Sequence, residues 1–118
     1  LTPPKAVAAM KVDPTIELGQ QLYVTEGCAA CHTIDGTQAE KPGPTWLGLY
    51  GSKREFADGG LIRKADEVYL RESILDPNRR VTKGFVSDDV KMPSYLGILQ
   101  DHQVDSLILY LKSLKKGK

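Results

Sequence analysis

The stretch "GCAACHT", residues 27–33, places two cysteines three positions apart with a histidine directly behind the second. Cys28 and Cys31 are the only cysteines among the 118 residues, and His32 is one of two histidines. Because these reactive side chains lie within five residues, they indicate a single chemical site. Three kinds of site are compatible with this motif: a redox-active dithiol, a structural zinc site and a covalent haem attachment site.

A redox dithiol of the thioredoxin type begins a helix in a fold that contains strands, since the helix dipole lowers the pKa of the thiol. Here the cysteine pair follows a predicted helix. No segment of the chain shows strand-like alternation flanked by hairpin signals. The sequence therefore disfavours this interpretation.

A zinc site would combine Cys28, Cys31 and His32 with His102 in a Cys₂His₂ set. Cys31 and His32 are adjacent, so both would not easily ligate one tetrahedral ion. His102 stands 70 residues after His32, in the first turn of a predicted helix where a polar residue is expected to be solvated. This spacing matches no compact zinc finger.

Covalent haem attachment has Cys-x-x-Cys-His as its sequence pattern. Cys28 and Cys31 would become thioethers to the porphyrin vinyl groups, and His32 would be the proximal ligand of the iron. One haem would also fill the middle of a domain whose predicted helices do not obviously close a core by themselves. The motif occurs by chance in many proteins, but in a chain with no other cysteine it favours haem.

The net charge and the length of the apolar runs limit which classes of partner we expect. Sixteen basic and fifteen acidic residues give a formal net charge of +1, which argues against a nucleic acid, because phosphate binding normally needs a clear basic excess on one face. No apolar run approaches the roughly 20 residues of a membrane span. We expect one domain over residues 13–118, preceded by a linker or tail over 1–12, and the first residue, Leu1, suggests a processed or excised product.

Three helices are predicted. Asp13 is the expected N-cap of the first, with Pro14 as its first residue, and this helix should run into residues 27–32. The second covers 66–75 and should pair Val68 with Leu75 and Leu70 with Ile74. The last has apolar residues at helical spacing: Val104, Leu107, Ile108, Leu111 and Leu114.

The segments between these helices, residues 33–64 and 78–99, lack sustained periodicity. Six of the eleven glycines lie in the first of them. Loops of this length in a compact domain are usually functional. We therefore expect an all-α fold in which long loops wrap around the haem.

The iron's sixth ligand has few candidates: Met10, Met92 and His102. Met10 lies in the predicted tail. Met92 lies in "DDVKMPSYLG", an irregular segment 60 residues after His32, with Pro93 stiffening the backbone behind it. These observations favour Met92 over the ordinary reading of a methionine that fills a core.

The chain from about Asp13 to Lys116 resembles a class I cytochrome c, with its early Cys-x-x-Cys-His, late Met-Pro loop and crossing first and last helices. The resemblance implies that Gly19 and Tyr23 of the first helix meet Tyr110 of the last. It also implies that the Pro44 carbonyl accepts a hydrogen bond from the His32 ring.

Further residues follow from the same resemblance. Trp46 stands where the family more often has Leu against the haem face, and it is expected to pack there. Tyr50 and Arg54 are expected to reach a haem propionate.

A closer similarity is to the cytochrome c domain fused to subunit II of caa3-type haem–copper oxidases. It rests on "RESILDPN", "MPSYLG" and "LILYLKSL". The Cys and His ligands of that subunit's dinuclear copper site are absent, so the chain would be only the haem domain. Gln100 stands where the family usually has Ser or Thr as the N-cap of the last helix.

The resemblance implies electron transfer, with His32 and Met92 bound in both oxidation states, and no bond chemistry by the domain alone. An upstream respiratory donor protein would supply the electron, and the copper centre of the oxidase subunit would accept it. The domain would lie outside the cytoplasmic membrane, on the periplasmic side, held to the membrane only through the parent complex. The alternatives are a free soluble shuttle and, if Met92 does not bind, a haem sensor or peroxidase-like enzyme.

Overall fold

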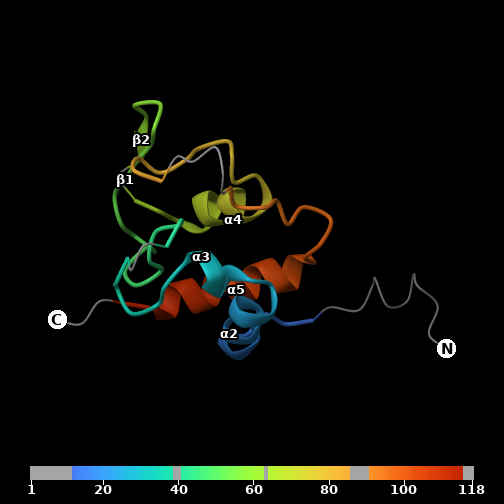
Figure 1. Ribbon diagram of the computed structural model, residues 1–118. Coiled ribbons are helices and arrows are strands. Elements are labelled where there is room, and N and C mark those ends of the chain that lie inside the picture. The colour runs from blue at the N-terminus through green and yellow to red at the C-terminus, as the bar shows by residue number, and fades with distance from the viewer. Residues whose placement is uncertain (1–11, 39–40, 63, 86–90, 116–118) are drawn as a thin grey trace.

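The computed structural model describes residues 12–38, 41–62, 64–85 and 91–115. In chain order these ranges contain α2 (Ile16–Thr25), α3 (Cys28–Cys31), β1 (Arg54–Glu55), β2 (Leu61–Ile62), α4 (Glu67–Leu75) and α5 (Asp101–Ser113). The described fold is mostly helical, as predicted, and long loops join its helices (Figure 1). None of the helices in these ranges has the length and hydropathy that a membrane crossing requires.

One prediction about α2 is wrong: the helix begins after Thr15, and Asp13 is not its cap. Thr15 is extended, and its Oγ1 accepts a hydrogen bond of 3.0 Å from the Leu18 N–H, as an N-cap residue does. The Thr15 N–H in turn donates to Ser106 Oγ of α5 at 3.1 Å. This second contact joins residues 91 positions apart, so local sequence signals do not reveal it.

The first helix does not continue into the cysteine motif. It ends at Thr25, and Gly27 then takes a left-handed conformation with φ of 81°, which glycine adopts without the steric cost of a side chain. The chain turns there and starts the separate short helix α3 at Cys28. This turn directs Cys28 into the core, where only 7% of its surface is exposed.

A small hairpin was missed by the sequence analysis. β1 and β2 pair antiparallel, with Arg54 opposite Ile62 and Glu55 opposite Leu61. An isolated bridge also joins Phe56 to Thr82 in the segment after α4. Two-residue strands are too short to show the period-two pattern by which strands are recognised.

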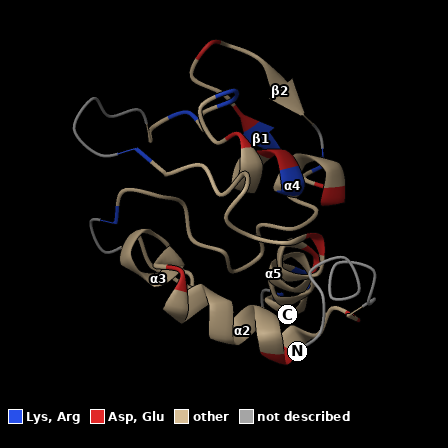
Figure 2. Cartoon of the chain, turned by 90° about the vertical axis from the view of Figure 1, so that its right-hand side faces the viewer, with Lys and Arg blue, Asp and Glu red and all other residues tan. Residues whose placement is uncertain are grey.

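Helices α2 and α5 cross, as the family resemblance implied (Figures 1 and 2). A Cβ added to Gly19 would lie 2.0 Å from the Ser106 carbonyl oxygen and 2.8 Å from Tyr110 Cβ. The ring of Tyr23 lies 5.9 Å from that of Tyr110, centroid to centroid. The two backbones therefore approach so closely that only glycine fits at the crossing.

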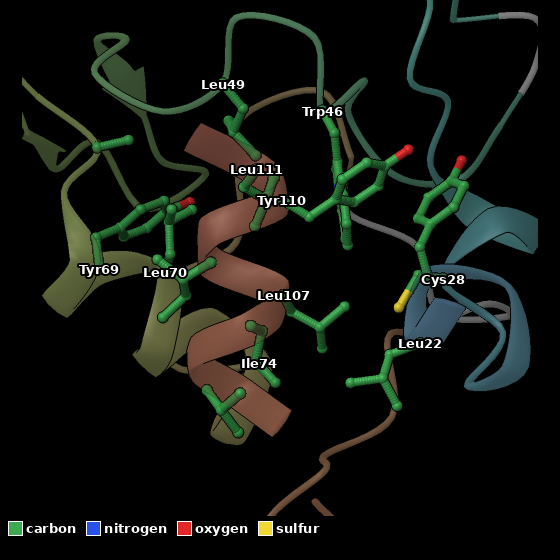
Figure 3. Packing of buried hydrophobic residues seen from close by; sticks show 14 of the residues in the cluster. Leu22, Cys28, Trp46, Leu49, Tyr69, Leu70, Ile74, Leu107, Tyr110 and Leu111 are labelled. Atoms are coloured by element: carbon green, nitrogen blue, oxygen red, sulfur yellow. The ribbon is translucent and has the colours of Figure 1, made fainter. Parts of the chain in front are cut away.

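Helix α5 is the centre of the hydrophobic core. Figure 3 shows its apolar side chains between Leu70 and Ile74 of α4 on one side and Leu22 and Cys28 on the other. Its predicted apolar face is confirmed, because four of its five residues are buried: Val104, Leu107, Ile108 and Leu111. The fifth, Leu114, is the C-cap of the helix and is partly buried.

Gln100 does cap α5, although it is neither Ser nor Thr. Its backbone N–H donates to Gln103 Oε1 at 2.7 Å, which is the reaching-back half of a capping box. Asp66 caps α4 by accepting from the Tyr69 N–H at 2.9 Å, and α4 ends at Leu75, close to the predicted bounds.

Val68, which was predicted to pair with Leu75, is 74% exposed and lies outside the core. α4 buries Tyr69, Leu70 and Ile74. The apolar residues of this nine-residue helix occupy more than one side, so the position of α5 decides which side is covered.

Replacing Gly19 by Ala is expected to destabilise the protein by about 1–3 kcal/mol, because a single Cβ overlaps the backbone of α5. Chemical denaturation measures this change. Gln20→Ala, at the exposed neighbouring position, is the control and should cause no loss. An unchanged midpoint for Gly19→Ala would contradict the close crossing.

Candidate functional site

The three residues of the Cys-x-x-Cys-His motif lie on one helical turn. Cys28 and Cys31 begin and end α3, so their side chains share a face. His32 follows as the C-cap, and its backbone N–H donates to the Cys28 carbonyl at 2.9 Å. His32 is buried, with 8% of its surface exposed.

Burial raises the pKa of the Cys28 thiol to about 11. The cysteine pair follows α2, as predicted, but it also stands on a short helix of its own. However, a redox dithiol needs a lowered thiol pKa, and here the shift has the opposite sign. The structure therefore disfavours the dithiol interpretation for electrostatic reasons.

The imidazole of His32 is held in one orientation. Its Nδ1 lies 2.7 Å from the Pro44 carbonyl oxygen, as the resemblance implied. A carbonyl only accepts, so Nδ1 carries the proton and Nε2 keeps its lone pair. Burial lowers the pKa of His32, and the hydrogen bond to Pro44 only partly opposes this shift, so the ring is neutral and able to ligate a metal.

Gly43 fits against this ring. A Cβ at Gly43 would lie 2.4 Å from His32 Cε1 and 2.7 Å from its Nδ1. The Gly43 N–H donates to the Cys31 carbonyl at 2.9 Å, and the Tyr23 hydroxyl donates to the His32 carbonyl. Backbone and side-chain contacts thus fix the histidine from several directions.

A cavity of about 290 Å³ adjoins the histidine. His32 and Cys31 line one part of it, and Met92, from the segment before α5, lines another. The walls are largely apolar and include Pro44, Trp46, Leu49, Leu70, Ile74 and Leu111. The fold therefore brings an imidazole, a thiol and a thioether from distant segments to one apolar space.

Of the other candidate ligands, only His102 lies among the described residues. His102 lies in the first turn of α5 and does not line the cavity. Met10 lies outside the described residues. Within the described ranges no three His, Cys, Asp or Glu residues gather to hold a metal ion, so the zinc set of Cys28, Cys31, His32 and His102 is not assembled.

Trp46 is buried and forms part of the cavity wall. Its ring centroid lies 5.6 Å from that of His32 and 4.9 Å from that of Tyr23. Trp46 thus lies beside the histidine, and its packing against the haem face stays a prediction.

Tyr50 lies away from the cavity, contrary to the expectation that it reaches a cofactor. Its hydroxyl donates to Glu67 Oε1 at 2.9 Å. Lys112 Nζ donates to the same oxygen at 2.9 Å and lies 5.2 Å from the centre of the Tyr50 ring. Tyr50 therefore joins its loop to α4 and α5, because tertiary partners satisfy its hydroxyl.

Arg54 lines a neighbouring shallow cavity rather than the apolar one, but Thr82 and Phe85 line both. The Arg54 Nε is buried and has no hydrogen-bond partner among the described residues. An unpaired buried donor is costly, so this atom can accommodate an acidic group.

Sequence reasoning missed several polar residues of the cavity. Tyr69, Ser73, Asn78, Arg80 and Thr82 line it. The first two lie on the inner face of α4, which a correct assignment of its buried side would have indicated. The other three lie in an irregular segment that carries no periodic signal.

This chain belongs to the cytochrome c family, whose profile matches residues 16–115. Two cytochrome c2 proteins from Rhodospirillum rubrum are similar to it. One is 25% identical over 103 residues, covering 78% of this chain and 76% of the relative. The other is 30% identical over 103 residues, covering 78% of this chain and 92% of the relative.

The protein is accordingly a class I c-type cytochrome, in which covalently bound haem c transfers electrons. The described residues fit that cofactor. Cys31, His32 and Met92 line one apolar cavity, and the His32 ring has a free Nε2. Cys28 does not line the cavity; it is buried in the apolar cluster, on the same face of α3 as Cys31.

Gly43→Ala is expected to displace the His32 ring and to lower the free energy of unfolding by about 1–3 kcal/mol, because the added methyl overlaps the imidazole. Denaturation of the purified protein measures the loss. Gly60→Ala is the matched control, since its Cβ would lie 3.2 Å from the end of the Asp58 side chain and 3.7 Å, an ordinary contact distance, from the Phe56 ring. Equal midpoints for both variants would count against the close fit of Gly43.

Proposed function

We propose that Cys28 and Cys31 attach the haem through thioether bonds and that His32 and Met92 are the axial ligands of its iron. The observation that carries this assignment is the shared cavity, which His32 and Met92 both line although 60 residues separate them. The haem supplies a one-electron iron couple when bound. A methionine ligand favours a higher reduction potential.

The chain's own residues orient and enclose that centre. The Pro44 carbonyl holds the Nδ1 proton of His32, which fixes the ring's tautomer and makes Nε2 a better ligand. Trp46, Leu70 and Leu111 line the cavity and exclude water from it, which limits reorganisation when the charge changes. Their role is to let an electron enter and leave while both axial ligands stay bound.

The proposed acceptor is the copper centre of a terminal oxidase, and the donor is an upstream respiratory protein. Support comes from the runs "RESILDPN" and "MPSYLG", which resemble the cytochrome c domain of caa3-type oxidases. In this proposal residues 1–12 connect the domain, residues 13–118, to the oxidase subunit, on the outer, periplasmic side of the cytoplasmic membrane. A connector replaces long-range steering with a high effective concentration, which suits a net charge of +1.

Exposed apolar residues at the end of α2 and in the Tyr95 loop support docking through short-range contacts. The Tyr95 hydroxyl donates to the Glu26 carbonyl, which brings the Tyr95 loop to the end of α2. Val24 is 66% exposed there, and Leu96 and Ile98 are 72% and 62% exposed in the loop. Figure 2 shows that the ribbon of α2 and α3 carries few charged residues. In the cytochrome c family the exposed haem edge lies next to the cysteine tethers, on this side.

The main alternative is a free soluble shuttle, which the same haem site would also serve. A sensor or a peroxidase-like enzyme would need a vacant sixth position, which binding of Met92 precludes. The measurements below separate these functions.

The purified protein is expected to exceed its polypeptide mass by one haem that acid–acetone does not extract. The reason is that thioether bonds to Cys28 and Cys31 survive this treatment. Intact-mass spectrometry tests the proposal, and a Cys28→Ser, Cys31→Ser double variant should lose the added mass. Extractable haem, bound zinc or two free thiols in the native protein would refute it.

Met92→Ala is expected to abolish the long-wavelength charge-transfer band of the ferric protein and to lower its reduction potential, since a thioether ligand is lost. The open position should then bind added imidazole. Met10→Ala, which changes the other methionine of the chain, should leave the spectrum unchanged. An unchanged spectrum for Met92→Ala would move the sixth ligand to Met10 or His102.

Electron transfer to a copper-containing oxidase fragment is expected to depend only weakly on ionic strength. Salt screens charges beyond roughly 8 Å at physiological strength, so a charge-steered shuttle slows sharply while apolar docking does not. Stopped-flow kinetics over a salt series measures this dependence. Leu96→Ser should slow the reaction, whereas Leu61→Ser, at an exposed site on β2, should not.

A steep fall in rate over moderate salt, with full activity of the untethered domain at low concentration, would instead favour the free shuttle. Equal rates for Leu96→Ser and the native protein would exclude the exposed apolar residues of α2 and the Tyr95 loop as the docking site.

A further inference from the structure

Arg80 forms an ion pair of fixed geometry beside the cavity. Its Nε lies 2.7 Å from Glu72 Oε1, and its Nη2 lies 3.0 Å from Glu72 Oε2. Two parallel hydrogen bonds of this kind hold the guanidinium plane against the carboxylate. The pair joins α4 to the segment after it, so the positive charge of Arg80 has a defined position.

Two aromatic rings hold the same guanidinium from another direction. Arg80 Cζ lies 5.3 Å from the centre of the Phe56 ring and 5.7 Å from that of Tyr69. The side chains of Arg80 and Glu72 are 32% and 19% exposed. The hydrogen bonds to Arg80 also lower the pKa of Glu72, so both partners are charged at neutral pH.

The two charges are not placed symmetrically with respect to the cavity. Arg80 lines it, together with His32 and Met92, whereas Glu72 does not. The ion pair therefore presents its positive end to the space assigned to the haem.

We propose that Arg80 raises the reduction potential of the haem iron, and that Glu72 and the rings of Phe56 and Tyr69 position its charge for this purpose. The inference rests on the proposed haem site. Reduction adds one negative charge to the iron, and a nearby cation stabilises that charge. Water weakens such an interaction for an exposed pair, but the apolar walls of this cavity preserve more of it.

Opposite substitutions in the pair test this role. Arg80→Gln leaves the Glu72 carboxylate alone, so the equilibrium constant for reduction against a reference dye should fall several-fold. Glu72→Gln keeps a hydrogen-bond acceptor but leaves the cation uncompensated, so the same constant should rise. The double variant should lie between the two.

A merely structural role would loosen the cavity in both variants and shift the constant in the same direction. Lys112→Gln is the matched control, because Lys112 also pairs with a glutamate and lies against a tyrosine ring, but does not line the cavity. It should leave the constant unchanged. Arg80→Lys keeps the positive charge and should retain more of the native value than Arg80→Gln, even though a lysine cannot form the paired hydrogen bonds.

The spectrum and mass of each variant distinguish a failure of the proposed role of Arg80 from a failure of the proposed haem site. Covalent haem with an intact methionine band and an unchanged reduction constant in both Arg80→Gln and Glu72→Gln would overturn the role of Arg80 alone. A native protein without covalent haem would overturn the site itself. Shifts of the same sign in both variants would also refute the electrostatic inference.

Discussion

The close crossing of α2 and α5 determines where the rest of the molecule lies. At Gly19 the two helices meet without an intervening side chain, a Cβ there being 2.0 Å from the Ser106 carbonyl oxygen. This contact sets the position of the end of α2, and the left-handed Gly27 then turns the chain into α3. The cysteine motif is therefore placed against the core by a backbone contact. Its buried Cys28 contributes to the same apolar cluster as α5.

The loop after the motif is ordered by polar contacts rather than by regular structure. The Gln38 side chain donates to the Gly43 carbonyl at 3.0 Å and accepts from the Thr45 N–H at 2.9 Å. The Trp46 N–H donates to the Thr33 carbonyl at 2.8 Å. These bonds place Pro44 where its carbonyl meets the His32 ring. The same loop therefore positions both the hydrogen-bond partner of the His32 ring and an aromatic wall of the cavity.

Charged residues are distributed unevenly over the described part of the molecule. Ion pairs link α4 to its neighbours, through Lys112 and Glu67 and through Arg80 and Glu72. Both signs occur around β1 and α4 in Figure 2, while the α2–α3 side carries few charges. If a partner docks beside α3, as we propose, it meets few charges there. The proposed role of Arg80 then assigns its charge to the cavity rather than to the docking surface.

The sequence alone determined the features that local chemistry controls. Cys-x-x-Cys-His indicated haem because the three side chains are contiguous, and the apolar spacing of α5 predicted its buried face because helical period is a local property. The resemblance to class I cytochromes supplied the contacts of Gly19 and of Pro44, which the structure contains. Where the local sequence allows several arrangements, only the tertiary structure decided which one forms. Thr15 caps α2 because its N–H also reaches Ser106.

The same holds for the residues that the sequence placed wrongly or did not place. Tyr50 is satisfied by Glu67 across the fold and so does not face the cavity. Arg80 does face it, because the chain returns past α4 and lays the guanidinium against Glu72 and two aromatic rings. Such positions depend on contacts between segments distant in sequence. Residue type and spacing therefore identified the cofactor, whereas long-range packing determined which other side chains surround it.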